Sequence, residues 1–450
     1  MYVVGETNGD HRFVFEQADG VRPIDLAMDD MFGKTPRTYM HDHTVTESYE
    51  GVTYDVRNLD EYIEQVLQLE AVACKDWLTN KVDRSVTGKI ARQQCQGVIQ
   101  LPLSDCGVVA LDYRGHAGIA TSIGHAPQAA MIDPAAGSVL AVAEALTNIV
   151  WAPLAEGLDS VSLSANWMWP CKNEGEDARL YKAVEACSDF VCELGINIPT
   201  GKDSLSMTQK YGEDKVYAPG TVIISAGAEV ADVRRVVSPV LQPVADSSIY
   251  YIDFSFDTLK LGGSAFAQSL GRVGDECPTV RDTEYFVSAF NAVQKLIKHG
   301  LVLAGHDISA GGIITTLLEM CFANTEGGME INFDALPEKD LIKILFAENP
   351  GVVMQTADPK AFEKVLREAG VGFLCIGKPA EERHIMVEKE GAQYQFIIDH
   401  LRDVWYESSY LLDRKQSGEA CATARFNNYK EQPLQIELPA AFTGKLAAYG

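Results

Sequence analysis

Glu144 and Asn148 lie four residues apart in MIDPAAGSVLAVAEALTNIVW, residues 131–151, and their spacing could support metal binding. The dense apolar positions of this stretch predict a mostly buried helix, with Asp133 or Ser138 as cap and Pro134 in the first turn. Residues i and i+4 share one helix face, so a carboxylate and an amide oxygen could bind the same hard cation. Glu144 could equally reach solvent or pair with an arginine, and the spacing alone leaves both interpretations open.

The segment LVLAGHDISAGGIITTLLEM, residues 301–320, carries a second group of polar side chains. A buried strand would bring His306, Asp307 and Ser309 to a Gly311-Gly312 turn that opens a helix. Backbone N–H groups at such a turn could bind an anion, and Asp307 could hold the accompanying Mg²⁺. Asp307 or Ser309 could instead be an ordinary helix cap.

Four weaker signals have structural alternatives of similar weight. Asp105 in LPLSDCGVV ends a strand-like run, where a lone aspartate is more often a turn residue. Lys202 in IPTGKDSLSM could meet a phosphate but lacks the spacing of a phosphate-binding loop. The turn before SAFAQSLG, at Gly262-Gly263, could bind an anion or only allow close packing. The aromatic pair in LSANWMW could form a site wall or a structural loop.

Strands mixed with long helices predict an α/β fold of the mixed α+β type. We expect residues 1–54 to be the tail of a preceding domain, with a hairpin at Asn8-Gly9 and a linker. Two α/β domains should follow at residues 55–210 and 211–410. Residues 411–450, with two prolines, should form a connector.

Composition narrows the function. The 450 residues are 46% hydrophobic and carry a formal charge of −25, which argues against a nucleic-acid partner but not against nucleotides held through Mg²⁺. Ten cysteines without CxxC spacing indicate reduced thiols and a cytoplasmic protein. No apolar run is long enough to suggest a membrane partner. Zinc-protease and serine-hydrolase motifs are absent from the sequence.

Eight motifs occur in an order that resembles the phosphoribosylformylglycinamidine synthase family. They are DRSVTGKIARQQCQG, LPLSDCGVV, IDPAAGSVLAVAEALTN, LSANWMW, NEGEDARLY, IPTGKDSLSM, LKLGGSAFAQ and AGHDISAGG. The resemblance is to the second half of the synthetase region in the large single-chain form. It implies an aminoimidazole ribonucleotide synthetase-like N-terminal-type domain followed by a C-terminal-type domain. The opening residues would end the first copy of this pair, and the last would lead to a glutaminase domain.

The resemblance also implies a reaction and a set of site residues. The whole enzyme would be a ligase of de novo purine biosynthesis that converts formylglycinamide ribonucleotide to formylglycinamidine ribonucleotide with ATP and glutamine. By position, the Mg²⁺ ligands are Asp105, Glu144, Asn148 and Asp307. Ser104 and Ser309 match positions that contact ATP or ADP, although Ser104 stands where alanine is common. The resemblance assigns no catalytic residue within this segment.

Three interpretations remain open. The chain could be a catalytic fragment, inactive without its first synthetase half and glutaminase domain, and prone to self-association through the sheet face that the first half would cover. It could be a structural half that holds an auxiliary Mg-ADP site without turnover. A related kinase acting on selenide or thiamine phosphate would need a complete site in one chain. The missing upstream glycine-rich loop disfavours that third interpretation.

Overall fold

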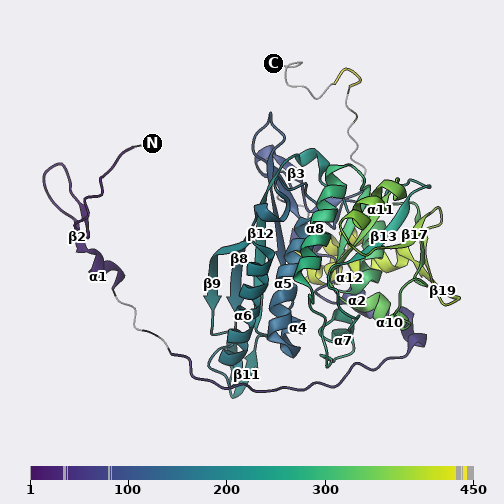
Figure 1. The fold of residues 1–450 in the computed structure, drawn as a ribbon, viewed down its shortest axis with the longest axis horizontal. Helices are drawn as coiled ribbons and strands as arrows, with labels where there is room; N and C mark the ends of the chain where they lie inside the picture. Colours follow the sequence, from purple (N-terminus) through teal and green to yellow (C-terminus); the bar gives the residue numbers. More distant parts are fainter. Residues whose placement is uncertain are drawn as a thin grey trace. The chain divides into compact units, whose positions relative to one another are not determined.

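The computed structural model describes residues 2–33, 37, 39–79, 82, 84–431, 437 and 439–442 (Figure 1). The chain divides into two compact units, residues 1–43 and residues 44–450. In the first unit, β1 (Arg12–Phe15) pairs antiparallel with β2 (Ile24–Ala27), and α1 (Met28–Phe32) follows. An ion pair between Arg12 and Asp25 joins the two strands. The expected turn at Asn8-Gly9 is wrong, because both strands of the hairpin lie after it.

The second unit contains two large sheets, and the first has six strands. Their order across the sheet is β3 (Ile90–Arg92), β6 (Gly107–Ala110), β7 (Gly118–Gly124), β12 (Thr221–Val230), β8 (Val161–Met168) and β9 (Asn197–Ser204). Only β8 and β9 pair in parallel. Helices α5 (Pro134–Ile149) and α6 (Glu176–Leu194) lie on one face of this sheet (Figure 1).

The opposite face of the first sheet is open. Burial alternates strictly along β7, so that Ala120 and Ser122 are buried while Ile119 and Ile123 are 48% and 57% exposed. Gly124 lets α5 approach β7 closely, since a Cβ there would lie 2.3 Å from the carbonyl oxygen of Ala141. A strand with one face buried and one exposed has this period-two pattern.

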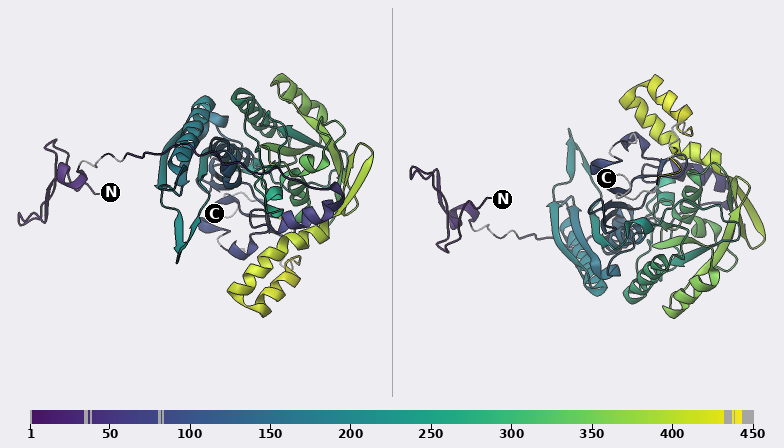
Figure 2. Two further views of the ribbon diagram at one scale, coloured as in Figure 1. Left: turned by 90° about the horizontal axis from the view of Figure 1, so that it is seen from below. Right: turned by 90° about the horizontal axis from the view of Figure 1, so that it is seen from above.

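The second sheet has seven strands and is covered on both faces. Their order is β14 (Ala304–Ile308), β16 (Gly351–Thr356), β13 (Ser248–Asp253), β17 (Leu374–Ala380), β15 (Gly328–Asn332), β18 (His384–Lys389) and β19 (Ala392–Ile397). All six residues of β16 are buried. One face packs against α8 (Thr283–Lys298) and α11 (Pro359–Glu368). The other packs against α2 (Leu59–Gln68), α9 (Gly312–Phe322), α10 (Leu341–Phe346) and α12 (Ile398–Ser417) (Figure 2).

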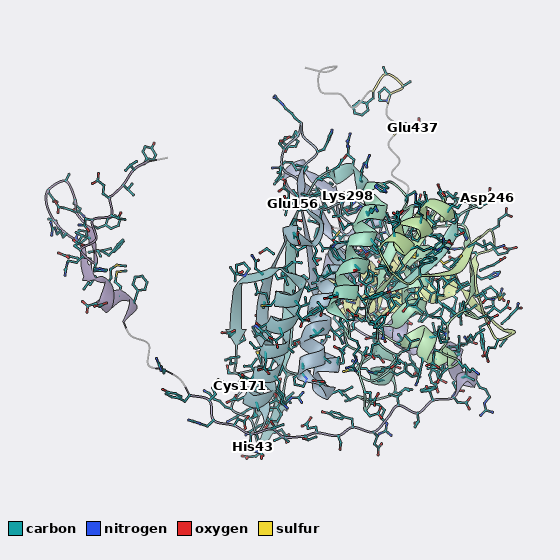
Figure 3. The ribbon with its side chains drawn as sticks, in the orientation of Figure 1. His43, Glu156, Cys171, Asp246, Lys298 and Glu437 are labelled. Atoms are coloured by element: carbon teal, nitrogen blue, oxygen red, sulfur yellow. The ribbon has the colours of Figure 1, made fainter. Side chains whose placement is uncertain are left out.

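The helices between the two sheets share one hydrophobic core. Phe190 of α6 meets Phe286 of α8 at a ring-centroid distance of 5.8 Å, and Phe254 meets Phe286 at 5.4 Å. Lys298 donates from Nζ to the carbonyl of Ala155, next to Glu156, at the end of this layer (Figure 3). Burial of this continuous core fixes the two sheets relative to each other.

The sheets divide between Val230 and Ser248, later than the expected boundary after residue 210. The strand at 221–230 pairs with both β7 and β8 and therefore lies inside the first sheet. The C-terminal expectation also needs correction, because α12 extends to Ser417 and α13 (Glu419–Asn428) packs against it. Tyr406 stacks on Tyr429 with ring centroids 3.9 Å apart. Much of residues 411–450 thus belongs to the folded unit, while 432–436, 438 and 443–450 lie outside the described residues.

Smaller elements complete the chain. They are α3 (Asp76–Thr79), β4 (Cys95–Gln96), β5 (Leu101–Pro102), α4 (Pro127–Ile132), β10 (Thr208–Tyr211), β11 (Asp214–Tyr217), α7 (Ala265–Ser269) and the 3-10 turns Val56–Asn58, Val86–Gly88, Gly157–Ser160 and Val233–Arg235. The helix expected at 131–151 begins at Pro134, because Asp133 caps it through the N–H of Ala135. Across the described ranges, the helices are all too short or too polar to span a membrane.

Candidate functional site

Asp105, His306 and Asp307 form a buried cluster where the second sheet meets the first. His306 and Asp307 are adjacent in β14, and Asp105 lies between β5 and β6. Nδ1 of His306 is 2.8 Å from Oδ1 of Asp105 and 3.4 Å from Oδ1 of Asp307. Nε2 of His306 is 2.9 Å from Oε2 of Glu319 in α9. One imidazole ring therefore joins three carboxylates from separate segments.

Two carboxylate oxygens in this cluster have no hydrogen-bond partner among the described residues. They are Oδ2 of Asp105 and Oδ2 of Asp307, both buried. Burial raises the pKa of both aspartates; His306 partly offsets this for Asp105, whereas the charge of Asp105 raises the pKa of Asp307 further. Burial alone would lower the pKa of His306, but Asp105 and Glu319 together raise it well above its ordinary value. Buried polar atoms are normally paired, so the two orphaned oxygens mark a position suited to a cation.

Glu144 borders the same cluster from α5. Its Oε2 accepts the backbone N–H of His125 at 2.7 Å. Burial raises the pKa of Glu144 to about 7. Its charge in turn contributes to raising the pKa of Asp307, so the two acids share one electrostatic environment. The sequence pattern could not distinguish this placement from a solvent-exposed glutamate.

Asn148 is placed differently. Its Nδ2 donates to the carbonyl of Ile123 at 3.0 Å and so ties α5 to β7. Among the described residues, no hydrogen bond joins Asn148 to Asp105 or Asp307. The structure thus places Asp105 and Asp307 together around His306, with Glu144 near enough to raise the pKa of Asp307 and Asn148 one turn further along α5.

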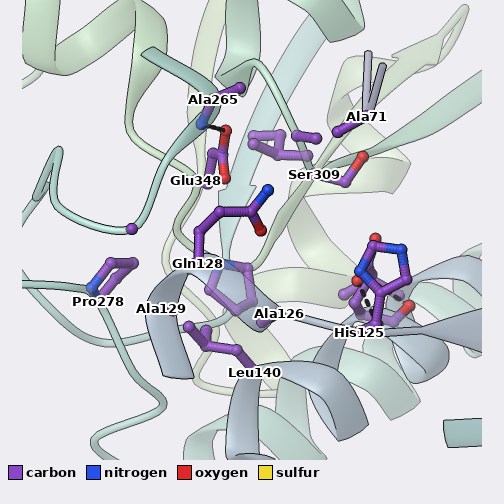
Figure 4. Close-up of a pocket in the computed structure, with 16 residues that line it drawn as sticks. Ala71, His125, Ala126, Gln128, Ala129, Leu140, Ala265, Pro278, Ser309 and Glu348 are labelled. Atoms are coloured by element: carbon purple, nitrogen blue, oxygen red, sulfur yellow. Dashed lines mark hydrogen bonds between the residues drawn. The ribbon is translucent and has the colours of Figure 1, made fainter. Parts of the chain in front are cut away.

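The two expected nucleotide-contacting serines line different cavities. Ser309 lines a small cavity of ≈ 70 Å³ with Glu144, His125 and Glu348 (Figure 4). Ser104 lines an open depression of ≈ 690 Å³ on the first sheet, next to Asp105. The Ser104 hydroxyl donates to the carbonyl of Gln93 and accepts from Nε2 of Gln96, each at 2.5 Å. Its side chain is therefore already engaged.

Glu348 is a site residue that the sequence reasoning missed. It follows α10, and its Oε1 accepts the backbone N–H groups of Ala265 at 2.8 Å and Gly311 at 2.7 Å. Burial raises its pKa to about 7. The two glycine turns that could have offered these N–H groups to a ligand are thus bound by a carboxylate of the chain itself. The only sequence signal was an acid between a buried helix and a buried strand, in LFAENPGVVM.

The two remaining sequence signals, Lys202 and the aromatic pair of LSANWMW, have structural roles. Lys202 lies exposed in the edge strand β9, where Nζ donates to Ser204 Oγ. Trp169 is 1% exposed, and Gly220 packs against its ring so closely that a Cβ would lie 2.3 Å away. Neither residue lines the cavity beside Glu144.

Two family models match the chain. A "FGAR-AT PurM_N-like domain" covers residues 74–229, and an "AIR synthase related protein, C-terminal domain" covers 249–387. The phosphoribosylformylglycinamidine synthase of Homo sapiens is 37% identical over 418 residues, or 91% of this chain. The chain belongs to the phosphoribosylformylglycinamidine synthase family. A probable phosphoribosylformylglycinamidine synthase of Arabidopsis thaliana, named chloroplastic/mitochondrial, is 36% identical over 94% of the chain.

The chain spans 31% of the length of both of these relatives. Among solved structures, Thermotoga maritima PurL complexed with FGAR has a TM-score of 0.58 at 14% identity, covering 76% of this chain and 53% of that one. The complex of the same protein with ATP has a TM-score of 0.56 at 15% identity, covering 76% and 52%. At such identity these matches establish the fold alone. The two family models confirm the expected N-terminal-type domain followed by a C-terminal-type domain.

In this member of the phosphoribosylformylglycinamidine synthase family, the candidate site lies between the two matched regions. Asp105 and Glu144 belong to the first, whereas Asp307 and Glu348 belong to the second. A cation held by both sets of acids would tie the two regions together. This location is typical of ligand sites, which occur preferentially between structural units.

Proposed function

We propose that this chain holds a Mg²⁺-nucleotide site of a phosphoribosylformylglycinamidine synthase. The pair of buried, unpartnered oxygens on Asp105 and Asp307 supports this proposal most strongly. Oxygen donors suit Mg²⁺, and carboxylates in an apolar setting gain stability from a divalent ion. Asp105, Glu144 and Asp307 would hold the ion, and Asn148 would contribute its amide oxygen. Ser309 and, through its backbone, Ser104 would contact ATP or ADP.

The full-length enzyme would then convert formylglycinamide ribonucleotide to formylglycinamidine ribonucleotide with ATP and glutamine. The bound Mg²⁺ would supply neutralisation of phosphate charge. His306 holds Asp105 in place, and Glu319 holds the other nitrogen of the His306 ring. All residues of β14 are buried, which strengthens the electrostatic interactions of His306 and Asp307, while Asp105 also lines the open depression on the first sheet. We assign no catalytic acid, base or nucleophile within this chain.

One alternative remains specific enough to test. The site could be auxiliary, holding Mg-ADP for stability while turnover occurs in another part of the enzyme. The depth of the cluster favours this alternative, since His306 and Asp307 are 6% and 3% exposed.

Asp307→Asn and Glu144→Gln in the full-length enzyme separate the two roles. If the site carries out turnover, the variants should have a lower rate per folded molecule while their unfolding temperature changes little. An auxiliary site should lose nucleotide-dependent stability more than rate. If both variants kept wild-type rate and wild-type stabilisation by Mg-ADP, the proposed site would be wrong.

We also propose the partners and the location of the chain. The open face of the first sheet would pair with the missing first synthetase half, and the glutaminase domain would follow the chain. All ten cysteines are free and seven are buried, which suits a reducing cytoplasm. In the isolated chain, the same open face would favour self-association.

A further inference from the structure

Glu348 connects two turns that come from distant parts of the sequence. One turn, Gly262-Gly263-Ser264, precedes α7, and the other, ending at Gly311, precedes the eleven-residue helix α9. A single oxygen, Oε1 of Glu348, accepts one backbone N–H from each turn. Charge-assisted hydrogen bonds of this kind are stronger than neutral ones.

The geometry of both turns is fixed by tight packing. Gly311 has a φ of +92°, and a Cβ there would lie 2.2 Å from Oγ1 of Thr315. Gly263 has a φ of +69°, and a Cβ there would lie 2.6 Å from Cα of Ala129. Both turns are tightly packed, and their two N–H groups point to one position, which Oε1 of Glu348 occupies. Free N–H groups at a glycine turn before a helix attract anions, and here the carboxylate of Glu348 is the anion.

The second oxygen of Glu348 is free to act on a ligand. Within the described part of the chain, Oε2 has no hydrogen bond, and Glu348 lines the cavity that also contains Ser309 and Glu144 (Figure 4). The rest of that wall is largely apolar, including Leu140, Ile308 and Pro350. A phosphate entering here would meet two carboxylates and find both N–H groups occupied. A hydroxyl or amino group would instead find an acceptor.

We infer that Glu348 is a specificity-determining residue that fills the anion position between the two turns and presents Oε2 to a hydrogen-bond donor of the ligand. The donor class is a hydroxyl or amino group, such as a ribose hydroxyl. The phosphates would remain with the Mg²⁺ that Asp105, Glu144 and Asp307 would hold. The inference depends on the proposed function only in naming a nucleotide as ligand; the occupied anion position does not depend on it.

Chemical rescue tests the anion position without any nucleotide. Glu348→Ala should lower the unfolding temperature at pH 8 without Mg²⁺. Formate or acetate should bind the vacated N–H groups and raise the unfolding temperature of this variant by about 3 °C. Wild type and the matched control Glu330→Ala, which removes an exposed glutamate paired with Lys378, should not respond. Sodium chloride at equal ionic strength controls for screening. A response of Glu348→Ala no larger than that of Glu330→Ala would overturn the inference.

A second variant covers the case in which Glu348→Ala does not fold. Glu348→Gln keeps one oxygen for the two N–H groups but turns an N–H donor toward the ligand. Binding of ADP with Mg²⁺, followed by calorimetry, should weaken at least about tenfold relative to wild type. Equal affinities would refute the acceptor role of Oε2. If wild type bound no ADP at all, the proposed nucleotide site would fail. Hydrogen exchange would then test the anion position: formate should protect the Gly311 and Ala265 amides in Glu348→Ala. If Glu348→Ala is unfolded, Glu348→Ser takes its place. Absence of protection by formate would overturn the proposed anion position.

Discussion

His306 is the residue on which the buried acids depend. Its ring contacts Asp105 and Glu319 on opposite nitrogens and lies near Asp307, so it is the cation nearest to these carboxylates. A buried charge without a partner is energetically costly. The negative charge of these acids can be balanced either by the histidine or by a bound Mg²⁺. The resemblance named the acids, but no sequence pattern indicated that a histidine joins them.

We expect His306→Gln to lower the free energy of unfolding in EDTA by about 3 kcal/mol, because the carboxylates lose their cation. Added Mg²⁺ should recover more stability in this variant than in wild type. Urea unfolding with and without Mg²⁺ measures both effects. His400→Gln is the control, since that histidine is exposed and forms an ion pair with the exposed Glu64. Equal Mg²⁺ stabilisation of wild type and His306→Gln would contradict this role.

Glu348 provides a pH-dependent prediction at the same scale. Its pKa rises from 4.5 to about 7 through burial. Below pH 4.5 the group is protonated in both states, and its contribution to stability is fully present. As pH rises toward and through 7, the unfolded chain ionises first and that contribution is lost, by at most about 3 kcal/mol. Urea unfolding in EDTA from pH 4.5 to 8 should therefore show a shallower decline for Glu348→Gln than for wild type. Parallel profiles would count against the raised pKa.

Strand β14 is the element that positions His306 and Asp307 in the candidate cluster. All five of its residues are buried, and Gly305 lies against the ring of Trp151. A Cβ added at Gly305 would lie 2.1 Å from Cζ3 of Trp151. The strand and the following helix were foreseeable, because apolar runs and a glycine turn are local signals. The approach of Asp105 to Asp307 was implied only by the family resemblance, because no local pattern shows which distant segments pair. The fold boundary was missed for the same reason, because β12 returns to the middle of the first sheet.

Gly305→Ala should therefore displace β14 and cost about 1–3 kcal/mol of stability, as overpacking does. It should also weaken Mg²⁺ binding, because His306 and Asp307 move with the strand. Gly227→Ala is a matched strand control with nothing within 4 Å of the added Cβ, and should change stability by less than about 0.5 kcal/mol. Denaturant unfolding and Mg²⁺ calorimetry of both variants make the comparison. Similar behaviour of the two alanines would argue against tight packing at Gly305.

At the scale of the whole molecule, the two sheets differ in how they are covered. The second sheet has helices on both faces, while the first exposes Ile119 and Ile123 of β7 on its open face. Exposed apolar sheet surfaces favour association with another chain or domain. The chain spans 31% of the length of its human relative, and the occupant that we propose for this face is the first synthetase half.

We expect the isolated chain to self-associate at micromolar concentration through this face. Ile119→Asp with Ile123→Asp should shift it toward monomer in sedimentation velocity, because burying two carboxylates in the interface is unfavourable. Val216→Asp, at an exposed position of the β10–β11 hairpin, is the control and should leave association unchanged. A wild-type chain that stays monomeric at every concentration would rule out this face as a self-association surface.

The convergence of Asp105, Glu144 and Asp307 on one Mg²⁺-nucleotide is tested most directly by calorimetric titration of ADP into this chain, with and without Mg²⁺. We expect weak binding that requires Mg²⁺ and is lost in Asp307→Asn, while that variant stays folded because it removes a buried charge. Binding of ADP to Asp307→Asn with wild-type affinity, or binding to wild type that ignores Mg²⁺, would contradict the proposed site.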